Sequence, residues 1–92
     1  MSNNHPNDVD AVLAERGARY GRFCDHAKIT QRFKTILAES SFKLNDSQNE
    51  ALEMIFHKIA RILNGDPNYA DSWVDIAGYA KLVADELEGN AK

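Results

Sequence analysis

Acidic side chains in the second half of the sequence lie at spacings that could support metal chemistry. Glu50 and Glu53 are three residues apart, and Asp71 and Asp75 are four apart, so each pair would share one side of a helix. Oxygen ligands of this kind suit Mg²⁺ or Mn²⁺. Glu50, Glu53, Asp71 and Asp75 are therefore the predicted metal ligands.

Two basic side chains near these acids give a second interpretation. Lys58 and Arg61 could bind a phosphate, or they could neutralise the aspartates across a helix interface. In the second case Asp71 would cap its helix and Asp75 would pair with Lys58 or Arg61. The residues leave both alternatives open.

A predicted turn between residues 16 and 23 carries further basic side chains. Glycine frees backbone amides, and arginines nearby could bind a phosphate. The spacing matches no phosphate-loop motif, so a surface turn with solvated arginines and an anchoring tyrosine is the alternative. The predicted phosphate-binding residues here are Arg19, Tyr20, Gly21 and Arg22.

The segment 66–79 places two large aromatic residues around a glycine. Gly78 inside a helix costs about 1 kcal/mol relative to alanine, so we expect a neighbouring helix or a ligand to press close there. Trp73 and Tyr79 would form walls of the ligand site or pack against it. A zinc site is not expected, because His57 has only Glu53 at ligand spacing, and His26 is predicted to pack beside an apolar stripe.

Helices must position these residues, and the periodicity of apolar residues predicts four helices. The predicted fold is an all-α, four-helix bundle-like domain with short loops over residues 7–89. Residues 1–6 are predicted to form a disordered tail, and residues 90–92 a second tail. The first expected helix runs from Asn7 to Gly17, and the second from Asp25 or His26 to Glu39. The third begins at a Ser47–Glu50 capping box or at Asp46 and ends at Gly65. The fourth begins at an Asp71 cap and ends at Glu88.

The last two expected helices each have two faces. The predicted core face of the third is Leu52, Ile55, Phe56, Ile59, Ile62 and Leu63, with Glu50, Met54, His57 and Arg61 on the other side. The predicted core face of the fourth is Trp73, Ile76, Ala77, Ala80, Val83, Ala84 and Leu87, with Asp71, Asp75, Gly78, Tyr79 and Leu82 on a second face.

Composition limits the partners. A chain of 92 residues buries only somewhat more than about 60% of the surface of its unfolded state, so it is marginally stable alone and a homo-oligomer is expected. No apolar run is long enough to span a membrane, and the single cysteine fits a reducing cytoplasm. The basic residues from Arg16 to Lys34 lack a nucleic-acid motif, and the acidic remainder opposes a phosphate track, so nucleic acid is not an expected partner.

Several segments together resemble a family of small phage and prophage proteins of unknown function. They are Arg16 with Tyr20-Gly21, then Lys58-Ile59-Ala60-Arg61, then Asp71-Ser72-Trp73-Val74-Asp75-Ile76-Ala77-Gly78-Tyr79. The resemblance covers residues from about 15 to 87. It implies a phage or prophage origin and a cytoplasmic location in the bacterial host.

A weaker similarity reaches the MazG-type all-α NTP pyrophosphohydrolases. These enzymes hold magnesium with a Glu-x-x-Glu helix followed by a Glu-x-x-Asp helix. Glu50-Ala51-Leu52-Glu53 fits the first motif, whereas Ser72 replaces the glutamate of the second if Asp75 is its aspartate. The similarity implies a degenerate, binding-only version or a hydrolase, and the sequence does not decide whether the protein is an enzyme.

Two functions are therefore expected. In the first, a polar seam between the third and fourth helices binds a nucleotide or another phosphate ligand. In the second, the seam is structural, and the protein acts by binding a host protein and inhibiting or redirecting it. An open seam would favour the first function, and a closed seam the second.

Overall fold

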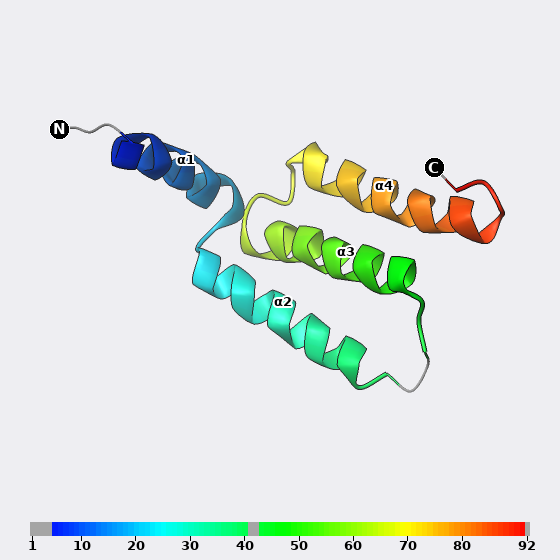
Figure 1. Cartoon of the computed structure of the whole chain (residues 1–92). Coiled ribbons are helices and arrows are strands. Elements are labelled where there is room, and N and C mark those ends of the chain that lie inside the picture. Colours follow the sequence, from blue (N-terminus) through cyan, green and yellow to red (C-terminus); the bar gives the residue numbers. More distant parts are fainter. Residues whose placement is uncertain (1–4, 41–42, 92) are drawn as a thin grey trace.

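Four helices account for most of the chain, and the long third helix lies at the centre. The computed structural model describes residues 5–40 and 43–91. Helix α3 lies between α2 and α4, which do not touch each other within those residues, and α1 meets the layer only near one end (Figure 1). The predicted all-α class with four helices is confirmed. The helices are α1 (His5–Tyr20), α2 (Phe23–Ala38), α3 (Asp46–Asn64) and α4 (Ala70–Leu87).

The molecule is elongated for its length. Its principal extents are 53 × 29 × 28 Å and its radius of gyration is 16.3 Å. A compact domain of this length would have a radius of gyration of about 12 Å. The difference arises because α1 projects beyond the α2–α3–α4 layer and no second layer covers that layer (Figure 1).

The core is thin as a consequence. Among the described residues only two apolar side chains, Ala51 and Ala60, are buried, and no large side chain is fully buried. The buried polar residues are His26, Thr30, Ser72 and Asp85. Rings of α2 and α3 do pack together, since Phe33 and Phe56 stack with their centroids 5.2 Å apart.

Predicted boundaries of all four helices are corrected, and α2 begins at Phe23 instead of Asp25 or His26. Helix α1 does not end at Gly17 but continues to Tyr20, because the left-handed residue that stops it is Gly21, at φ 79°. The capping box of α3 is formed by Asn45 and Gln48, not by Ser47 and Glu50. The Asn45 side chain accepts from the Gln48 amide at 2.8 Å, and the Gln48 side chain accepts from the Asn45 amide at 3.0 Å.

The start of α4 differs from the expected aspartate cap. The helix begins at Ala70, its N-cap is Tyr69 with no side-chain capping bond, and Asp71 is an exposed residue of the first turn. Asp71 remains favourable there, because a carboxylate near a helix N-terminus interacts with the helix dipole. Gly65 and Gly89 follow α3 and α4 as expected, and Gly89 is left-handed at φ 82°.

The predicted tails are described only in part. Residues 1–4 and Lys92 lie outside the described residues, and α1 begins at His5, inside the predicted first tail. At the other end the Asn90 amide donates to the Asp85 carbonyl at 2.6 Å. None of the helices in the described ranges has the length and hydrophobicity needed to cross a membrane.

Candidate functional site

The turn between α1 and α2 is fixed to the C-terminal end of α3. The Asn64 side-chain amide donates to the Tyr20 carbonyl at 3.0 Å and to the Arg22 carbonyl at 2.9 Å. Between those two carbonyls Gly21 adopts a left-handed φ, and a Cβ at this position would overlap the Asn64 carbonyl oxygen. The predicted Arg19–Arg22 turn is therefore a docked part of the fold and not a free surface loop.

Gly65 and Asp66, which follow Asn64, add to the contact between the α1–α2 turn and the end of α3. The Asp66 amide donates to the Arg19 carbonyl at 2.8 Å. Gly65 lies so close to this turn that an added Cβ would overlap the Arg19 carbonyl and the Tyr20 backbone. Two segments that are more than 40 residues apart in sequence thus form one rigid corner where α1, α2 and α3 meet.

Tyrosine rings orient two arginines at this corner. The Arg61 guanidinium lies 4.3 Å from the centroid of the Tyr20 ring, and the Arg19 guanidinium lies 4.3 Å from that of Tyr69. Arg19 also donates to the Tyr69 hydroxyl at 3.2 Å, and the two tyrosine rings meet edge to face at 6.3 Å. Stacked guanidinium groups keep their edges available for an anion.

A pair of histidines joins α2 to α3 next to the arginines. His26 Nε2 and His57 Nδ1 are 3.3 Å apart, and one nitrogen donates to the other according to the tautomers. Burial lowers the pKa of His26 most, and the nearby charges of His57 and Arg61 lower it further. The Phe23 ring lies nearly parallel to that of His26, with centroids 6.1 Å apart and planes inclined by 20°.

The pKa of His57 is lowered as well. Burial is again the main cause, and the positive charges of Lys34, Arg61 and Lys58 act in the same direction. Glu53 opposes them, but the net direction is downward. Both imidazoles are therefore held neutral near pH 7, which suits the hydrogen bond between them.

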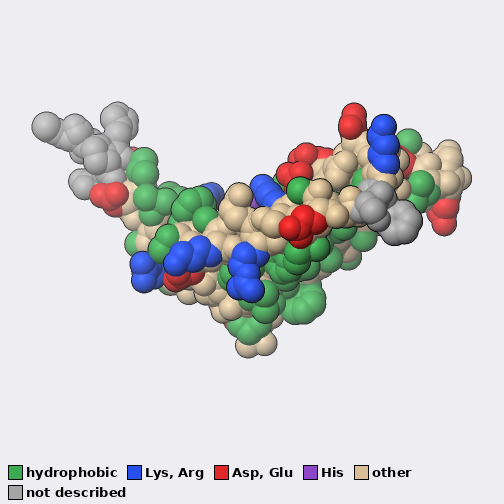
Figure 2. Space-filling view, turned by 90° about the horizontal axis from the view of Figure 1, so that it is seen from below, with side chains coloured by type: hydrophobic (Ala, Val, Ile, Leu, Met, Phe, Trp, Pro, Cys, Tyr) green, Lys and Arg blue, Asp and Glu red, His purple; other side chains and the backbone are tan. Residues whose placement is uncertain are grey.

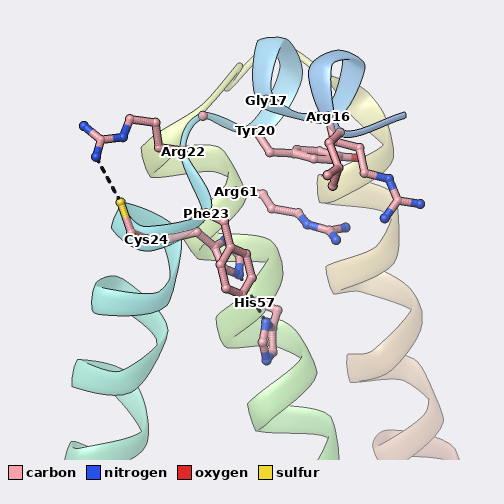
Figure 3. A pocket seen from close by; sticks show the side chains of 11 residues that line it. Arg16, Gly17, Tyr20, Arg22, Phe23, Cys24, His57 and Arg61 are labelled. Carbon is pink, nitrogen blue, oxygen red and sulfur yellow. Dashed lines mark hydrogen bonds between the residues drawn. The ribbon is translucent and has the colours of Figure 1, made fainter. Parts of the chain in front are cut away.

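These groups surround a pocket of about 650 Å³ at the corner (Figure 3). Its volume lies within the usual range for small-ligand sites. In Figure 3 Arg16 and Arg61 extend on the same side as Tyr20, whereas Arg22 extends away toward Cys24. None of the described lining residues is acidic; they are Leu13, Arg16, Gly17, Tyr20, Gly21, Arg22, Phe23, Cys24, His26, His57 and Arg61.

An ion pair crosses the predicted seam between α3 and α4. Lys58 Nζ lies 2.9 Å from an Asp75 carboxylate oxygen, and only 12% of the Lys58 side chain is exposed. This geometry is the predicted pairing of Asp75 with Lys58 across the helix interface. Arg61, the other candidate partner, turns instead to Tyr20 and the corner pocket.

The four predicted metal ligands are not gathered in one cluster. Glu53 lies 3.8 Å from Lys34, Asp75 is paired with Lys58, and Asp71 is exposed. Within residues 5–40 and 43–91 no three or more His, Cys, Asp or Glu side chains are placed to hold a metal ion. Magnesium or manganese binding by these residues remains a prediction, without a preformed cluster in the single chain.

The two predicted aromatic wall residues lie away from the corner pocket. The Trp73 indole N–H donates to the Pro67 carbonyl at 2.9 Å and so fixes the loop before α4, while 55% of this residue stays exposed. Tyr79 and Glu50 line a separate groove between α3 and α4. A Cβ added at Gly78 would meet no other described residue within 4 Å, so the expected close contact is not made in this part of the chain.

Seven lining residues were not predicted as ligand residues: Leu13, Arg16, Gly17, Phe23, Cys24, His26 and His57. Arg16 lies one helical turn before Tyr20, a spacing that could have linked it to the predicted turn. The sequence places His57 on the polar side of α3 with Arg61, again one turn apart. His26 and Phe23 come from another helix, α2. No spacing in the sequence indicates that these rings meet.

Comparison with known proteins assigns a family. A family model described as a domain of unknown function, DUF6378, matches residues 7–87. No curated protein and no solved structure shows a significant match to the chain. The family match spans all four helices and the whole corner pocket, and the chain therefore belongs to the DUF6378 family.

Proposed function

We infer that the protein binds a phosphate-bearing small molecule, such as a nucleotide, in the corner pocket between α1, α2 and α3. The observation that carries this proposal is the charge of the lining. Arg16, Arg22 and Arg61 line a pocket of about 650 Å³ in which no described lining residue is acidic. Arginine is well suited to phosphate, because its guanidinium can donate two parallel hydrogen bonds.

The remaining lining residues suit the rest of a nucleotide. Tyr20, Phe23 and the His26–His57 pair offer flat ring surfaces beside the arginines, with Phe23 80% exposed. Aromatic rings stack on nucleobases in a way that tolerates any base. The proposal moves the predicted phosphate site from the α3–α4 seam to the corner, where Tyr20, Gly21, Arg22 and Arg61 are the predicted ligand residues that line the pocket.

The finer expectations from the sequence belong to the same proposal. The Lys58–Arg61 and Asp71–Tyr79 segments support a phage or prophage origin, and with it a cytoplasmic location in a bacterial host. The Glu50–Glu53 pair supports a relationship to the MazG-type pyrophosphohydrolases. Hydrolysis would require Glu53 and Asp75 to leave Lys34 and Lys58 and turn to a metal ion. The proposal therefore concerns binding.

A thermal-melting titration tests this function. Phosphate, pyrophosphate and ATP, each with EDTA or with Mg²⁺, are added to the wild-type protein. A ligand at 100 times its dissociation constant adds about 2.7 kcal/mol to the free energy of unfolding. Arg16→Gln should weaken binding about 10-fold to 100-fold, because it removes a charged hydrogen-bond donor.

A matched control separates the pocket from general charge. Arg32 is an exposed arginine of α2 that does not line the pocket, so Arg32→Gln should bind like the wild type. Equal weakening of ligand binding by both variants, or no shift of the melting temperature with any ligand, would refute phosphate binding in the corner pocket. A shift that needs Mg²⁺ and ATP together would support the pyrophosphohydrolase-like version and justify an assay of pyrophosphate release.

One observation favours the second expected function, binding of a host protein. Val74 and Leu82 of α4 lie about two helical turns apart and are 64% and 45% exposed, so they could contact an apolar surface of a partner. If no phosphate ligand shifts the melting temperature, Val74→Asp should abolish capture of a host protein by the tagged chain. Capture that is unchanged in this variant would exclude this part of α4 as the contact.

A further inference from the structure

The apolar sides of α2, α3 and α4 lie on the same face of the layer. At 100° per residue, Leu52, Phe56, Ile59 and Leu63 form one stripe along α3. A groove of about 370 Å³ joins Leu52 of this stripe to Ala80 of α4. On the other side of α3 the Phe33–Phe56 contact brings α2 into the same surface.

The α4 part of this surface repeats at coiled-coil spacing. Trp73, Ala77, Ala80, Ala84 and Leu87 follow one another at intervals of four, three, four and three residues, and all five are exposed. We name the surface formed by these five residues, the α3 stripe and Ile36 of α2 the apolar face. The sequence predicts all of these positions of α3 and α4 to be core, yet among the described residues Leu63 and the five α4 side chains remain exposed.

The exposure of the apolar face is large. Ile36 is 64% exposed, Leu63 66% and Leu87 67%. Figure 2, which views the layer from the α2 side, shows hydrophobic side chains along the lower edge of the central part of the molecule. Most of the acidic, basic and histidine side chains in that view lie above this edge.

The accessible area indicates how much surface is left uncovered. The chain exposes 6730 Å², whereas a folded monomer of 10.3 kDa would expose about 5,400 Å². The excess of about 1,300 Å² exceeds the roughly 800 Å² that each partner contributes to a stable interface. The excess belongs to the whole elongated chain, α1 included, and the exposed apolar side chains of α2, α3 and α4 contribute part of it, so the surface has room for an interface of standard size.

We propose that the apolar face binds a second copy of this chain in a two-fold symmetric dimer. The face carries both halves of a complementary shape, because the α3 stripe is made of large side chains and the middle of the α4 stripe consists of Ala77, Ala80 and Ala84. A two-fold rotation places the α3 of each copy over the α4 of the other. Large side chains then fill the shallow alanine strip, and the two layers form one four-helix core.

This arrangement leaves the corner pocket free. His57 and Arg61 lie on the opposite side of α3, about half a turn from Leu52, Ile59 and Leu63. The dimer proposal is thus independent of the proposed ligand, and either can fail without the other.

The oligomeric state of the full chain tests the proposal. Light scattering coupled to size-exclusion chromatography should give twice the chain mass of 10.3 kDa for the wild type. Leu63→Glu should give the single-chain mass, because two carboxylates would be buried against apolar side chains. Val74→Glu is the matched control: Val74 is 64% exposed but lies outside the apolar face, so this variant should remain dimeric.

Two outcomes would overturn the proposal. One is a wild-type chain that is monomeric at 100 µM, even if it captures another protein. The other is a dimer that Val74→Glu dissociates and Leu63→Glu does not. If Leu63→Glu fails to fold, the wild type still decides: its melting temperature should rise with chain concentration over a 100-fold range for a dimer, and stay constant for a monomer.

Discussion

The two faces of the α2–α3–α4 layer share their helices but differ in how their side chains are satisfied. On the polar face the chain supplies its own partners: Lys58 pairs with Asp75, His26 with His57, and Arg61 with the Tyr20 ring. On the apolar face Ile36, Leu63, Trp73 and Leu87 remain more than half exposed.

This difference shows which surface is complete in one chain. A polar group satisfied by a neighbour gains little from a further protein partner, because its desolvation is already compensated. An exposed apolar face gains free energy from any contact that removes it from water. This difference supports the two proposals: a small ligand at the charged corner of the polar face, and a second protein surface on the apolar face.

The largest expected effect comes from the corner that carries the pocket. Gly21→Ala should lower the free energy of unfolding by about 3 kcal/mol or more, because it adds left-handed strain and an overlap with Asn64. Gly17 lines the same pocket but has open space around it inside α1. Gly17→Ala should stabilise the chain by up to about 1 kcal/mol.

Urea unfolding followed by circular dichroism measures both variants. Equal effects of Gly21→Ala and Gly17→Ala would mean that the turn is not docked on α3, and the corner would lose its role in shaping the pocket. Phosphate binding by a folded Gly21→Ala chain at wild-type affinity would have the same meaning.

An intermediate effect is expected from the ion pair on the polar face. Asp75→Asn should cost about 2 kcal/mol, since it leaves the Lys58 ammonium, 12% exposed, without its carboxylate. The cost is below that of a fully buried pair, because Asp75 is 34% exposed. Asp71→Asn, at an exposed first-turn position, should change stability by no more than about 0.5 kcal/mol.

The same two variants distinguish a structural seam from a ligand site. A structural role requires that Asp75→Asn melts at a lower temperature and binds phosphate ligands with wild-type affinity. If Asp75→Asn melts like the wild type but loses a Mg²⁺-dependent ligand shift, the predicted metal site at the seam would be right and the closed ion pair would be an inactive arrangement.

The helices were predictable because each carries its own apolar period, and α3 has the clearest one. The orientation of α4 was harder to predict. Its second face was assigned to the residues around Asp75 and Tyr79, yet both are half-buried while Ala77, Ala80 and Ala84 are exposed. Helical periodicity defines the angle between two faces, but it does not say which face meets a helix of the same chain and which meets another chain.

The pocket was predictable only in the parts that are local in sequence. Tyr20, Gly21 and Arg22 could be found because glycine and arginine lie together, and Arg61 because it shares a helix with Lys58. The meeting of His26 with His57 depends on how Asn64 docks the α1–α2 turn, which is a tertiary contact over more than 40 residues. No local pattern encodes such a contact, since its energy comes from two partially buried rings and one amide.

The smallest expected effect is a loss of stability when the pH is lowered, caused by the histidine pair on the polar face. The pKa values of His26 and His57 are lowered in the folded chain, so the unfolded chain binds more protons below their ordinary value of about 6.5. Stability is therefore complete above about pH 6.5 and decreases as the pH falls through the folded-state pKa values. The melting temperature should decline between pH 7.5 and 5.5, above the range in which most carboxylates titrate.

The melting temperature of the double variant His26→Gln, His57→Gln should depend less on pH than that of the wild type. In the wild type, a bound anion should reverse the sign of this pH dependence. Phosphate near Arg16 and Arg61 would favour protonated imidazoles, so its stabilising effect should increase as the pH falls. If the melting temperatures of the wild type and the double variant change equally with pH, the histidine pair is not the cause of the pH dependence. A phosphate effect that does not change with pH would place the anion away from the pair, and hence outside the corner pocket.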